Sequence, residues 1–218
     1  MSRDFSCILF DLDGTIVDSA PGITATLDYT FRTLGRSVPS PAELVAFVGP
    51  PIIDSFRERA GMTLEEAHHA LEIYKPEYLA HGVLDATVYP GIGDVLKEIH
   101  ERGIPMSLAT SKPEKPARMI LAYYDLLKYF DEITGASEDE VLSAKADIVA
   151  EALSRLDAIG ADVSRPVMVG DRHHDVMGAS AHDVPTIFVR WGYGSPAEEV
   201  GAIGVATDAA TLRTLLFA

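Results

Sequence analysis

The chain of 218 residues is long enough for one α/β domain with a large core, or for such a domain with a small insert. Its 33 acidic residues against 18 basic residues give a formal net charge of −15, which argues against nucleic acid or an anionic membrane as the main partner, because both attract clustered positive charge. A single cysteine excludes an internal disulfide, and the sequence has neither a signal-peptide pattern nor an apolar stretch that approaches a membrane span. We therefore expect a cytoplasmic protein, a monomer or weak homodimer, with neither a nucleic acid polymer nor a membrane as partner.

The first predicted strand covers residues 7–10, an apolar run that ends abruptly at Asp11. A short apolar run bounded by turn residues is typical of a buried strand in a parallel sheet. Asp13 follows two residues later, so both carboxylates point to one side if the chain stays nearly extended, and Gly14 lets the backbone turn. Open α/β sheets bind ligands at the carboxyl ends of such strands. Taken alone, this stretch also fits a simple polar turn, and residues further along the chain decide between the two interpretations.

The next stretch, residues 21–84, has helical spacing throughout. The apolar face of its first predicted helix consists of Ile23, Leu27, Phe31 and Leu34. A capping-box pattern, Thr63 with Glu66, begins a later helix, which Pro76 is expected to kink or break. This stretch therefore predicts an all-helical insert behind the first strand.

From residue 89 onward, predicted helices and strands alternate. The strands are predicted over residues 105–109, 129–134, 166–170 and 186–189, and the helices over residues 92–101, 113–124 and 145–156 and from residue 175. Such alternation is typical of a parallel sheet with helices on both faces. We expect an α/β fold with a doubly wound parallel sheet, in which residues 1–18 and 86–218 form the core and residues 19–85 the helical insert.

Polar residues follow three of the predicted strands. They are Asp11 and Asp13 after the first strand, Thr110, Ser111 and Lys112 after residues 105–109, and Asp171 after residues 166–170. Because the carboxyl ends of parallel strands lie along one edge of a sheet, these side chains can converge on one cleft. Lys145, at the start of a predicted helix, is a further candidate.

Asp175, at the start of a predicted helix and four residues after Asp171, is a further candidate. The carboxylates of Asp11, Asp171 and Asp175 cannot share a small site without a counter-charge, since like charges strongly disfavour joint ionisation. Mg²⁺ is the natural remedy, because it prefers oxygen ligands, uses one or two protein carboxylates and brings phosphate oxygens with it. The hydroxyl of Thr110 or Ser111 and the ammonium group of Lys145 would then bind those phosphate oxygens.

Four motifs resemble, in order and spacing, those of the haloacid dehalogenase-like (HAD) phosphohydrolases, and together they span the chain. The first is residues 11–15, the second residues 110–112, the third Lys145 and the fourth residues 170–175. The helical insert is similar to the small helical cap of this family. The resemblance implies a Rossmann-like core with a cap. It also implies phosphatase activity, because dehalogenases of this fold lack the second aspartate, here Asp13, and use no metal.

The resemblance further implies a role for each matching residue. Asp11 would be the nucleophile that forms an aspartyl phosphate, and Asp13 would be the general acid and then the base. Mg²⁺ would be held by Asp11, the main-chain carbonyl of Asp13, Asp171 and, from nearby, Asp175. The phosphoryl group would be bound by Thr110, Ser111 and Lys145.

Two features depart from the family pattern. Lys145 is not followed by the proline that cap-bearing phosphatases often have, and Lys112 or Lys115 are alternatives for its role. His173 and His174 form a pair in the fourth motif. Because no cysteine or other histidine clusters with this pair, we interpret both as rim residues rather than as zinc ligands.

Several further features have both a structural and a functional interpretation. Gly49-Pro50-Pro51 either lines a substrate site or only separates two helices. Arg57 either contacts a substrate carboxylate or lies on a helix surface. Trp191 and Tyr193 either line the mouth of the cleft or belong to an ordinary loop. The sequence does not decide between these interpretations.

The function that we expect is that of a Mg²⁺-dependent phosphatase, which hydrolyses a small soluble phosphomonoester through an aspartyl phosphate. The loop of residues 48–51 and the fourth motif look like those of the phosphoglycolate phosphatase-like group, whose neighbours include 5′-nucleotidase-like and pyrophosphatase-like hydrolases. A sugar-phosphate mutase and a non-catalytic phosphate-binding regulator are further alternatives. A receiver-like signalling domain is disfavoured, because such domains are shorter, lack a cap and carry the phosphorylated aspartate later in the chain.

Overall fold

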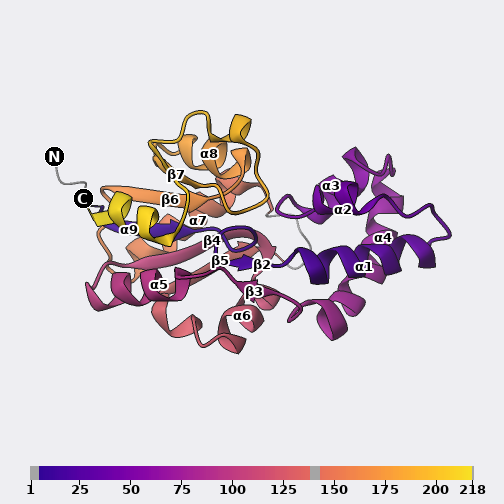
Figure 1. Cartoon of the computed structure of the whole chain (residues 1–218), viewed down its shortest axis with the longest axis horizontal. Helices are drawn as coiled ribbons and strands as arrows, with labels where there is room; N and C mark the ends of the chain where they lie inside the picture. The colour runs from indigo at the N-terminus through magenta and orange to yellow at the C-terminus, as the bar shows by residue number, and fades with distance from the viewer. Residues whose placement is uncertain (1–4, 138–142, 218) are drawn as a thin grey trace.

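The computed structural model describes residues 5–137 and 143–217. Six strands in these ranges form one parallel sheet in the order β5-β4-β1-β6-β7-β8. They are β1 (Cys7–Phe10), β4 (Met106–Pro113), β5 (Glu132–Ala136), β6 (Pro166–Gly170), β7 (Thr186–Val189) and β8 (Gly204–Ala206). The chain starts in the centre at β1, builds outward to β5 on one side and then to β8 on the other (Figure 1). The predicted doubly wound α/β fold is therefore confirmed.

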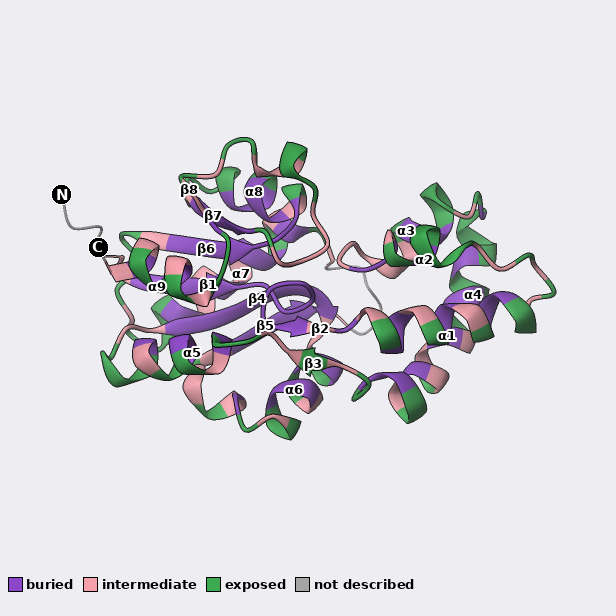
Figure 2. Cartoon of the chain, in the orientation of Figure 1, coloured by how far each residue is buried: buried purple, intermediate pink, exposed green. Residues whose placement is uncertain are grey.

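Helices cover both faces of the sheet because side chains alternate between the faces along each strand. In β1, Ile8 and Phe10 belong to the larger apolar cluster of the core, and Cys7 and Leu9 to the smaller one. The larger cluster includes residues of α5 (Ile92–Glu101), α6 (Glu114–Tyr123) and α9 (Ala209–Phe217), and the smaller one residues of α7 (Lys145–Ala158) and α8 (His173–Ser180). Figure 2 shows the central strands buried along their length. The core thus fixes the carboxyl ends of these strands in position.

The helical insert lies between two short strands, β2 (Val17–Asp18) and β3 (Thr87–Val88). Its elements are α1 (Ala20–Thr33), α2 (Pro41–Val45), α3 (Ile52–Glu58), α4 (Leu64–Glu77) and the π-helical turn η1 (Tyr78–Gly82). They pack around the edge-to-face rings of Phe31, Phe47, Phe56 and Tyr74. The insert lies beyond the carboxyl ends of the sheet strands (Figure 1), so it faces the edge where the motifs were expected to meet.

The structure also shows elements that the sequence did not predict. The strands β2 and β3 pair antiparallel where the insert joins the core, and two residues are too few to show an alternating pattern. The edge strand β8 was missed as well. Of the kink or break predicted at Pro76, the break does not occur: this proline lies inside α4, and the helix passes into the π-helical turn η1 directly after it. A π-helical turn is one way in which a helix absorbs a local disturbance of its hydrogen bonds.

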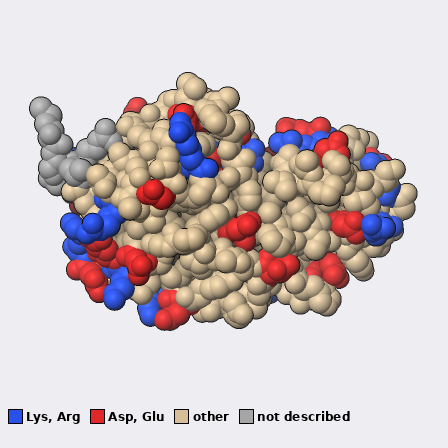
Figure 3. All heavy atoms as spheres, in the orientation of Figure 1, with Lys and Arg blue, Asp and Glu red and all other residues tan. Residues whose placement is uncertain are grey.

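The outside of the molecule carries paired charges. Figure 3 shows Lys and Arg side chains beside Asp and Glu, and Arg102 and Arg213, for example, both bond to Glu98. Exposed pairs of this kind contribute little to stability. In the part of the chain that the structure describes, no helix has the length and apolar character needed to cross a bilayer.

Candidate active site

The carboxyl ends of β1, β4 and β6 bring the four motifs together. Asp11 follows β1, Asp171 follows β6, and Lys145 begins α7 beside them. All of the predicted site residues are buried: Asp11, Asp13, Thr110, Ser111, Lys145, Asp171 and Asp175. Because a buried charge must be paired or bound by an ion, the partners of these side chains indicate what the site can hold.

Three carboxylates form an acidic cluster, which consists of Asp11, Asp171 and Asp175. One oxygen of each lies within 4.8 Å of the others. Burial raises the pKa of Asp11 to about 6, although the charge of Lys145 acts in the opposite direction. Burial, together with the charges of Asp175 and Asp11, also raises the pKa of Asp171. A buried set of oxygens with excess negative charge fits a hard divalent cation such as Mg²⁺.

Lys145 contacts two members of the acidic cluster directly. Its Nζ lies 2.7 Å from Asp11 Oδ1 and 2.8 Å from Asp175 Oδ1, and it donates to the main-chain carbonyl of Ala109 at 3.0 Å. Burial acts to lower the pKa of Lys145, but the charges of Asp11 and Asp175 outweigh this effect and raise it. The lysine therefore stays charged beside Asp11, although no proline follows it in the sequence.

Asp13 has partners of its own, outside the acidic cluster. Ser19 Oγ donates to Asp13 Oδ1 at 2.6 Å, and Lys112 Nζ lies 2.9 Å from Asp13 Oδ2. Lys112 is buried and lies over the ring of Tyr78, 4.8 Å from its centre. Two aspartates only two residues apart thus have different lysine partners, Lys112 here and Lys145 in the acidic cluster. Separate environments allow them separate chemical roles.

Gly14 allows the first motif to pass close to Asp171. Its φ of 85° lies in the left-handed region, and a Cβ at this position would stand 2.3 Å from Asp171 Oδ2. The next residue, Thr15, donates from Oγ1 to Asp171 Oδ1 at 3.4 Å. The turn after β1 is therefore fitted closely around Asp171, the carboxylate that begins the fourth motif.

Residues 8–189, which include all four motifs, match the haloacid dehalogenase-like hydrolase family. The chain belongs to this family. It is 38% identical to the tyrosine-protein kinase PtkA of Mycobacterium tuberculosis over 95% of this chain and 70% of that protein. It is 34% identical to a 5′-nucleotidase of Pseudomonas aeruginosa, over 88% of this chain and 85% of that protein. A phosphoglycolate phosphatase of Pseudomonas fluorescens is 32% identical, over 96% of this chain and 78% of that protein.

Solved structures of this haloacid dehalogenase-like family have the same fold. A predicted phosphatase from Clostridium acetobutylicum matches with a TM-score of 0.91 at 34% identity, over 98% of each chain. The structure of PtkA from Mycobacterium tuberculosis matches with a TM-score of 0.84 at 35% identity, over 98% of this chain and 99% of that one. The relatives act on different substrates according to their names, so the likeness establishes a HAD-family enzyme and leaves the substrate open.

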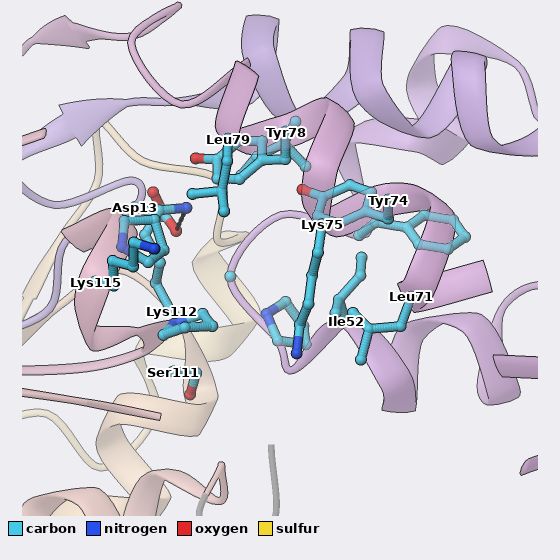
Figure 4. A pocket seen from close by; sticks show the side chains of 16 residues that line it. Asp13, Ile52, Leu71, Tyr74, Lys75, Tyr78, Leu79, Ser111, Lys112 and Lys115 are labelled. Atoms are coloured by element: carbon cyan, nitrogen blue, oxygen red, sulfur yellow. Dashed lines mark ion pairs between the residues drawn. The ribbon is translucent and has the colours of Figure 1, made fainter. Parts of the chain in front are cut away.

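In this HAD hydrolase, a cavity of about 200 Å³ lies between the insert and the core (Figure 4). The core contributes Asp13, Ser111, Lys112 and Lys115 to its lining, and the insert contributes Gly49, Pro50, Ile52, Leu71, Tyr78 and Leu79. In Figure 4, Asp13 and Lys112 lie together on one side, and Lys75 extends from α4 on the other. The cavity therefore begins at Asp13 and continues along mainly apolar residues of the insert.

The loop between α2 and α3 contacts both the cavity and the fourth motif. Gly49 and Pro50 line the cavity, and the carbonyl of Val48 accepts a hydrogen bond from Arg172 Nη1 at 2.9 Å. Arg57, by contrast, is exposed on α3, apart from the described residues that line the cavity. Of the two features of the insert that the sequence left open, the loop lies at the site and Arg57 does not.

The paired histidines of the fourth motif lie outside the acidic cluster. His173 is exposed, and its Nδ1 lies 3.0 Å from Glu198 Oε2. The ring of His174 lies against that of His173 at an angle of 41°, with 3.8 Å between their centres. Burial, with the neighbouring charges, lowers the pKa of His174 to about 4, so it is neutral at pH 7. Their positions agree with rim residues and not with ligands of this cluster.

Two contacts that hold the site were not predicted from the sequence. Ser19 bonds to Asp13, as described above, and the main-chain N–H of Tyr193 donates to Asp171 Oδ2 at 2.6 Å. A signal for Tyr193 was present, because it stands between two glycines after a predicted strand, where the backbone often approaches another group closely. Ser19 carried no comparable signal, since a serine before a helix is usually a capping residue.

Proposed function

We propose that the chain is a Mg²⁺-dependent phosphatase that hydrolyses a small soluble phosphomonoester through an aspartyl phosphate on Asp11. The observation that carries this proposal is the contrast between two neighbouring carboxylates. Asp11 lies in the acidic cluster beside Lys145, whereas Asp13 is bound by Lys112 and Ser19. A nucleophile and a proton-transfer group need such separate environments.

The residues of the acidic cluster fit Mg²⁺. They offer carboxylate oxygens alone, and burial and mutual repulsion raise the pKa of Asp11 and Asp171, which a bound cation would offset. Asp11, Asp171, Asp175 and the main-chain carbonyl of Asp13 would hold the ion. When bound, Mg²⁺ would reduce the repulsion between these carboxylates and a substrate phosphate.

In the first step, a carboxylate oxygen of Asp11 would attack phosphorus while the bond between phosphorus and the leaving oxygen breaks. Asp13 would give its proton to that leaving oxygen. Lys145, with the hydroxyl groups of Thr110 and Ser111, would bind the remaining phosphate oxygens. The contact of Lys145 with Asp11 supports this role.

In the second step, Asp13 would take a proton from the water that attacks the phosphorus of the aspartyl phosphate. The bond between phosphorus and the Asp11 oxygen would break, which releases inorganic phosphate and restores the carboxylate. Ser19 and Lys112 hold both oxygens of Asp13 in the present arrangement. Each carboxylate oxygen keeps a further lone pair beside its contact, so Asp13 can bind the proton that it gives to the leaving group.

The same proposal assigns different tasks to two parts of the chain. Residues 1–18 and 86–218 would be the catalytic core, and residues 19–85 a cap that selects the leaving group. The pairing of β2 with β3 supports these boundaries, because it lies where the chain leaves and re-enters the core. The cavity supports the division of tasks, because the core lines its catalytic end and the insert its apolar part.

The cavity favours a leaving group that is larger and more apolar than glycolate. A volume of about 200 Å³ exceeds what a two-carbon acid fills, and Ile52, Leu71 and Leu79 give the insert side an apolar lining, although Lys75 and Lys115 also line the cavity and could pair with a carboxylate. Pyrophosphate has no apolar part at all. Of the candidates that the sequence suggests, a 5′-nucleotide-like substrate is therefore supported best, and the phosphoglycolate phosphatase-like assignment comes second.

Phosphoryl transfer to a tyrosine is a second candidate function. The observation in its favour is the 38% identity, over 95% of this chain, to a protein named tyrosine-protein kinase. The two functions differ in the group that accepts the phosphoryl from the enzyme, which is water in one and a phenol in the other.

A panel of phosphomonoesters tests the proposed function, with a 5′-nucleotide, phosphoglycolate and an activated aryl phosphate assayed in Mg²⁺ and in EDTA. We expect phosphate release that requires Mg²⁺ and is lost in Asp11→Asn. The exposed Asp157→Asn is the matched control and should keep its activity. Substantial turnover in EDTA or in Asp11→Asn would sink the proposal. Labelled ATP with a tyrosine-containing protein tests the second candidate, which phosphotyrosine formation without phosphate release would favour.

A further inference from the structure

A loop of the core, residues 190–194, is anchored to the first and the fourth motif at once. It follows β7 and contains Trp191, the single tryptophan of the chain. Trp191 Nε1 donates to the main-chain carbonyl of Thr15 at 3.1 Å. The N–H of Tyr193 donates to Asp171 Oδ2 at 2.6 Å. The loop therefore holds one carboxylate of the acidic cluster by a main-chain contact.

The side chain of Tyr193 makes a second set of contacts, at the start of α1. Its hydroxyl accepts hydrogen bonds from the N–H groups of Ser19 (2.8 Å) and Ala20 (3.0 Å) and donates one to Asp18 Oδ1 (2.7 Å). The first N–H groups of a helix have no partner within the helix. Ser19, at the N-cap position, does not cap α1 with its side chain, because that side chain bonds to Asp13. Tyr193 accepts from these N–H groups instead, from 174 residues away from Ser19 in the chain, and the N–H of Ala20 also lies 3.2 Å from Asp18 Oδ1.

The two glycines beside Tyr193 make this arrangement possible. A Cβ at Gly192 would lie 2.3 Å from Asp171 Oδ2 and 2.3 Å from the carbonyl oxygen of Gly14. A Cβ at Gly194 would lie 1.9 Å from the carbonyl oxygen of Asp171. These distances are far below van der Waals contact, so only glycine lets the loop approach Asp171 on both sides of Tyr193.

We propose that Tyr193 is a positioning residue that fixes the start of the insert relative to the acidic cluster. Its main-chain N–H holds Asp171, while its hydroxyl holds the main chain of Ser19, whose own hydroxyl holds Asp13. Through Ser19, the hydroxyl thereby positions Asp13 and the start of the insert, which act on the leaving group. The main chain serves the metal side, through Asp171. The kinetic and Mg²⁺-binding consequences rest on the proposed function, and the hydrogen exchange at Ser19 does not.

Tyr193→Phe separates these two ends, because it removes the hydroxyl and keeps the N–H that holds Asp171. Tyr29→Phe is the matched control, since it makes the same change at an exposed tyrosine of α1. Two measurements on the full chain need no substrate. One is the rate of hydrogen exchange at the Ser19 N–H, and the other is the Kd for Mg²⁺ from a calorimetric titration. In Tyr193→Phe we expect exchange at Ser19 to become about tenfold faster, and the Kd for Mg²⁺ to stay within about twofold of the wild type.

The kinetic measurement compares a phosphomonoester that has a poor leaving group with an activated aryl phosphate. In Tyr193→Phe, kcat/KM should fall about tenfold for the poor leaving group and less than about twofold for the activated one. A merely structural role of the hydroxyl would lower both values alike. Gly192→Ala should act at the other end and raise the Kd for Mg²⁺ about tenfold or more, since the added Cβ displaces Asp171.

Unchanged exchange at Ser19, or an equal loss on both esters, would overturn the proposal. A Kd for Mg²⁺ that rises as far in Tyr193→Phe as in Gly192→Ala would also overturn it. If the wild-type protein hydrolyses none of the esters, the proposed function fails. The hydrogen exchange at Ser19 then still decides whether Tyr193 joins the insert to the acidic cluster.

Discussion

The two sides of the cleft are built from different interactions. On the core side, buried charges have defined partners at short distance, as in the pairs Asp11–Lys145 and Asp13–Lys112. On the insert side, the cavity is lined mainly by aliphatic and aromatic side chains such as Ile52. The energy of a buried charge pair depends steeply on geometry, whereas apolar contact depends on the area that is covered. We therefore expect the core side to tolerate few changes, and the insert side to accept changes that alter which substrate fits.

Asparagine in place of Asp13 should cause a large loss of turnover on the core side. It can neither give a proton to the leaving group nor take one from water, so turnover should fall about 10²–10⁴-fold. An activated aryl phosphate, whose leaving group needs no proton, should recover part of the first step and give a burst. Rapid-mixing kinetics with good and poor leaving groups measure this difference. Equal losses on both would argue against the role of Asp13, and Asp157→Asn again serves as control.

Methionine in place of Lys145 should lower the free energy of unfolding of the core. Asp11 and Asp175 would lose their buried cation, and breaking a buried pair costs about 3–5 kcal/mol in the free energy of unfolding. Added Mg²⁺ should restore part of this loss, because it binds the same carboxylates. Urea unfolding in EDTA and in Mg²⁺ measures both effects.

The matched control for this variant is Lys97→Met. Lys97 pairs with Glu101 at 3.7 Å on the surface of α5, so its removal should change the free energy of unfolding by less than about 1 kcal/mol. If Lys145→Met is as stable as this control in EDTA, the acidic cluster does not depend on Lys145 for its charge balance.

The pH dependence of stability sharpens the description of the acidic cluster. Burial raises the pKa of Asp11 from its ordinary value of 3.8 to about 6, so the folded protein keeps a proton that the unfolded chain has released. The resulting stabilisation is present below about pH 4 and is lost as the pH rises through about 6. The loss is of order 1–3 kcal/mol. To isolate this effect, the free energy of unfolding is measured in EDTA across this pH range for the wild type and for Asp11→Asn. A difference between the two that does not change with pH would contradict the prediction.

Alanine in place of Ile52 should change only the substrate preference that the insert side sets, and its effect should be the smallest of those predicted here. Ile52 lines the insert side of the cavity on α3 and belongs to none of the four motifs, so the Mg²⁺ requirement should not change. The ratio of kcat/KM between a 5′-nucleotide and a small aryl phosphate should shift by about tenfold, the usual effect of a few methyl groups in an apolar pocket. Ile159→Ala, on the exposed end of α7, should leave the ratio fixed. If all rates of Ile52→Ala fall together at a constant ratio, the insert is only a lid.

The positions of the site residues could be predicted because pattern and chemistry coincide at the strand ends. At Asp11 and again at Asp171, an apolar run stops at a carboxylate, which predicts both a buried strand and a group at its end. Lys145 was identified by its place in the order of motifs. The structure brings these residues together, whereas their catalytic roles stay predictions, as do the state as monomer or weak homodimer and the cytoplasmic location.

The partners of these residues could not be predicted, because they depend on packing between distant segments. The pairing of Lys145 with Asp11 joins residues 134 apart in the chain, and the sequence alone allowed Lys112 in the same role. The contact between Tyr193 and Ser19 spans 174 residues and replaces a local helix cap. Such contacts leave no periodic signal, unlike the apolar face of a helix.

Direct detection of phosphorylated Asp11 tests the central claim of this account. Asp13→Asn, mixed rapidly with an activated aryl phosphate and Mg²⁺ and then quenched in acid, should accumulate the aspartyl phosphate, because the step that hydrolyses it lacks its base. Mass spectrometry of the peptide that contains residues 5–19 should locate the phosphoryl group on Asp11, and the double variant with Asp11→Asn should carry none. A phosphoryl group on another residue, or steady phosphate release with no labelled peptide at any time, would contradict the account.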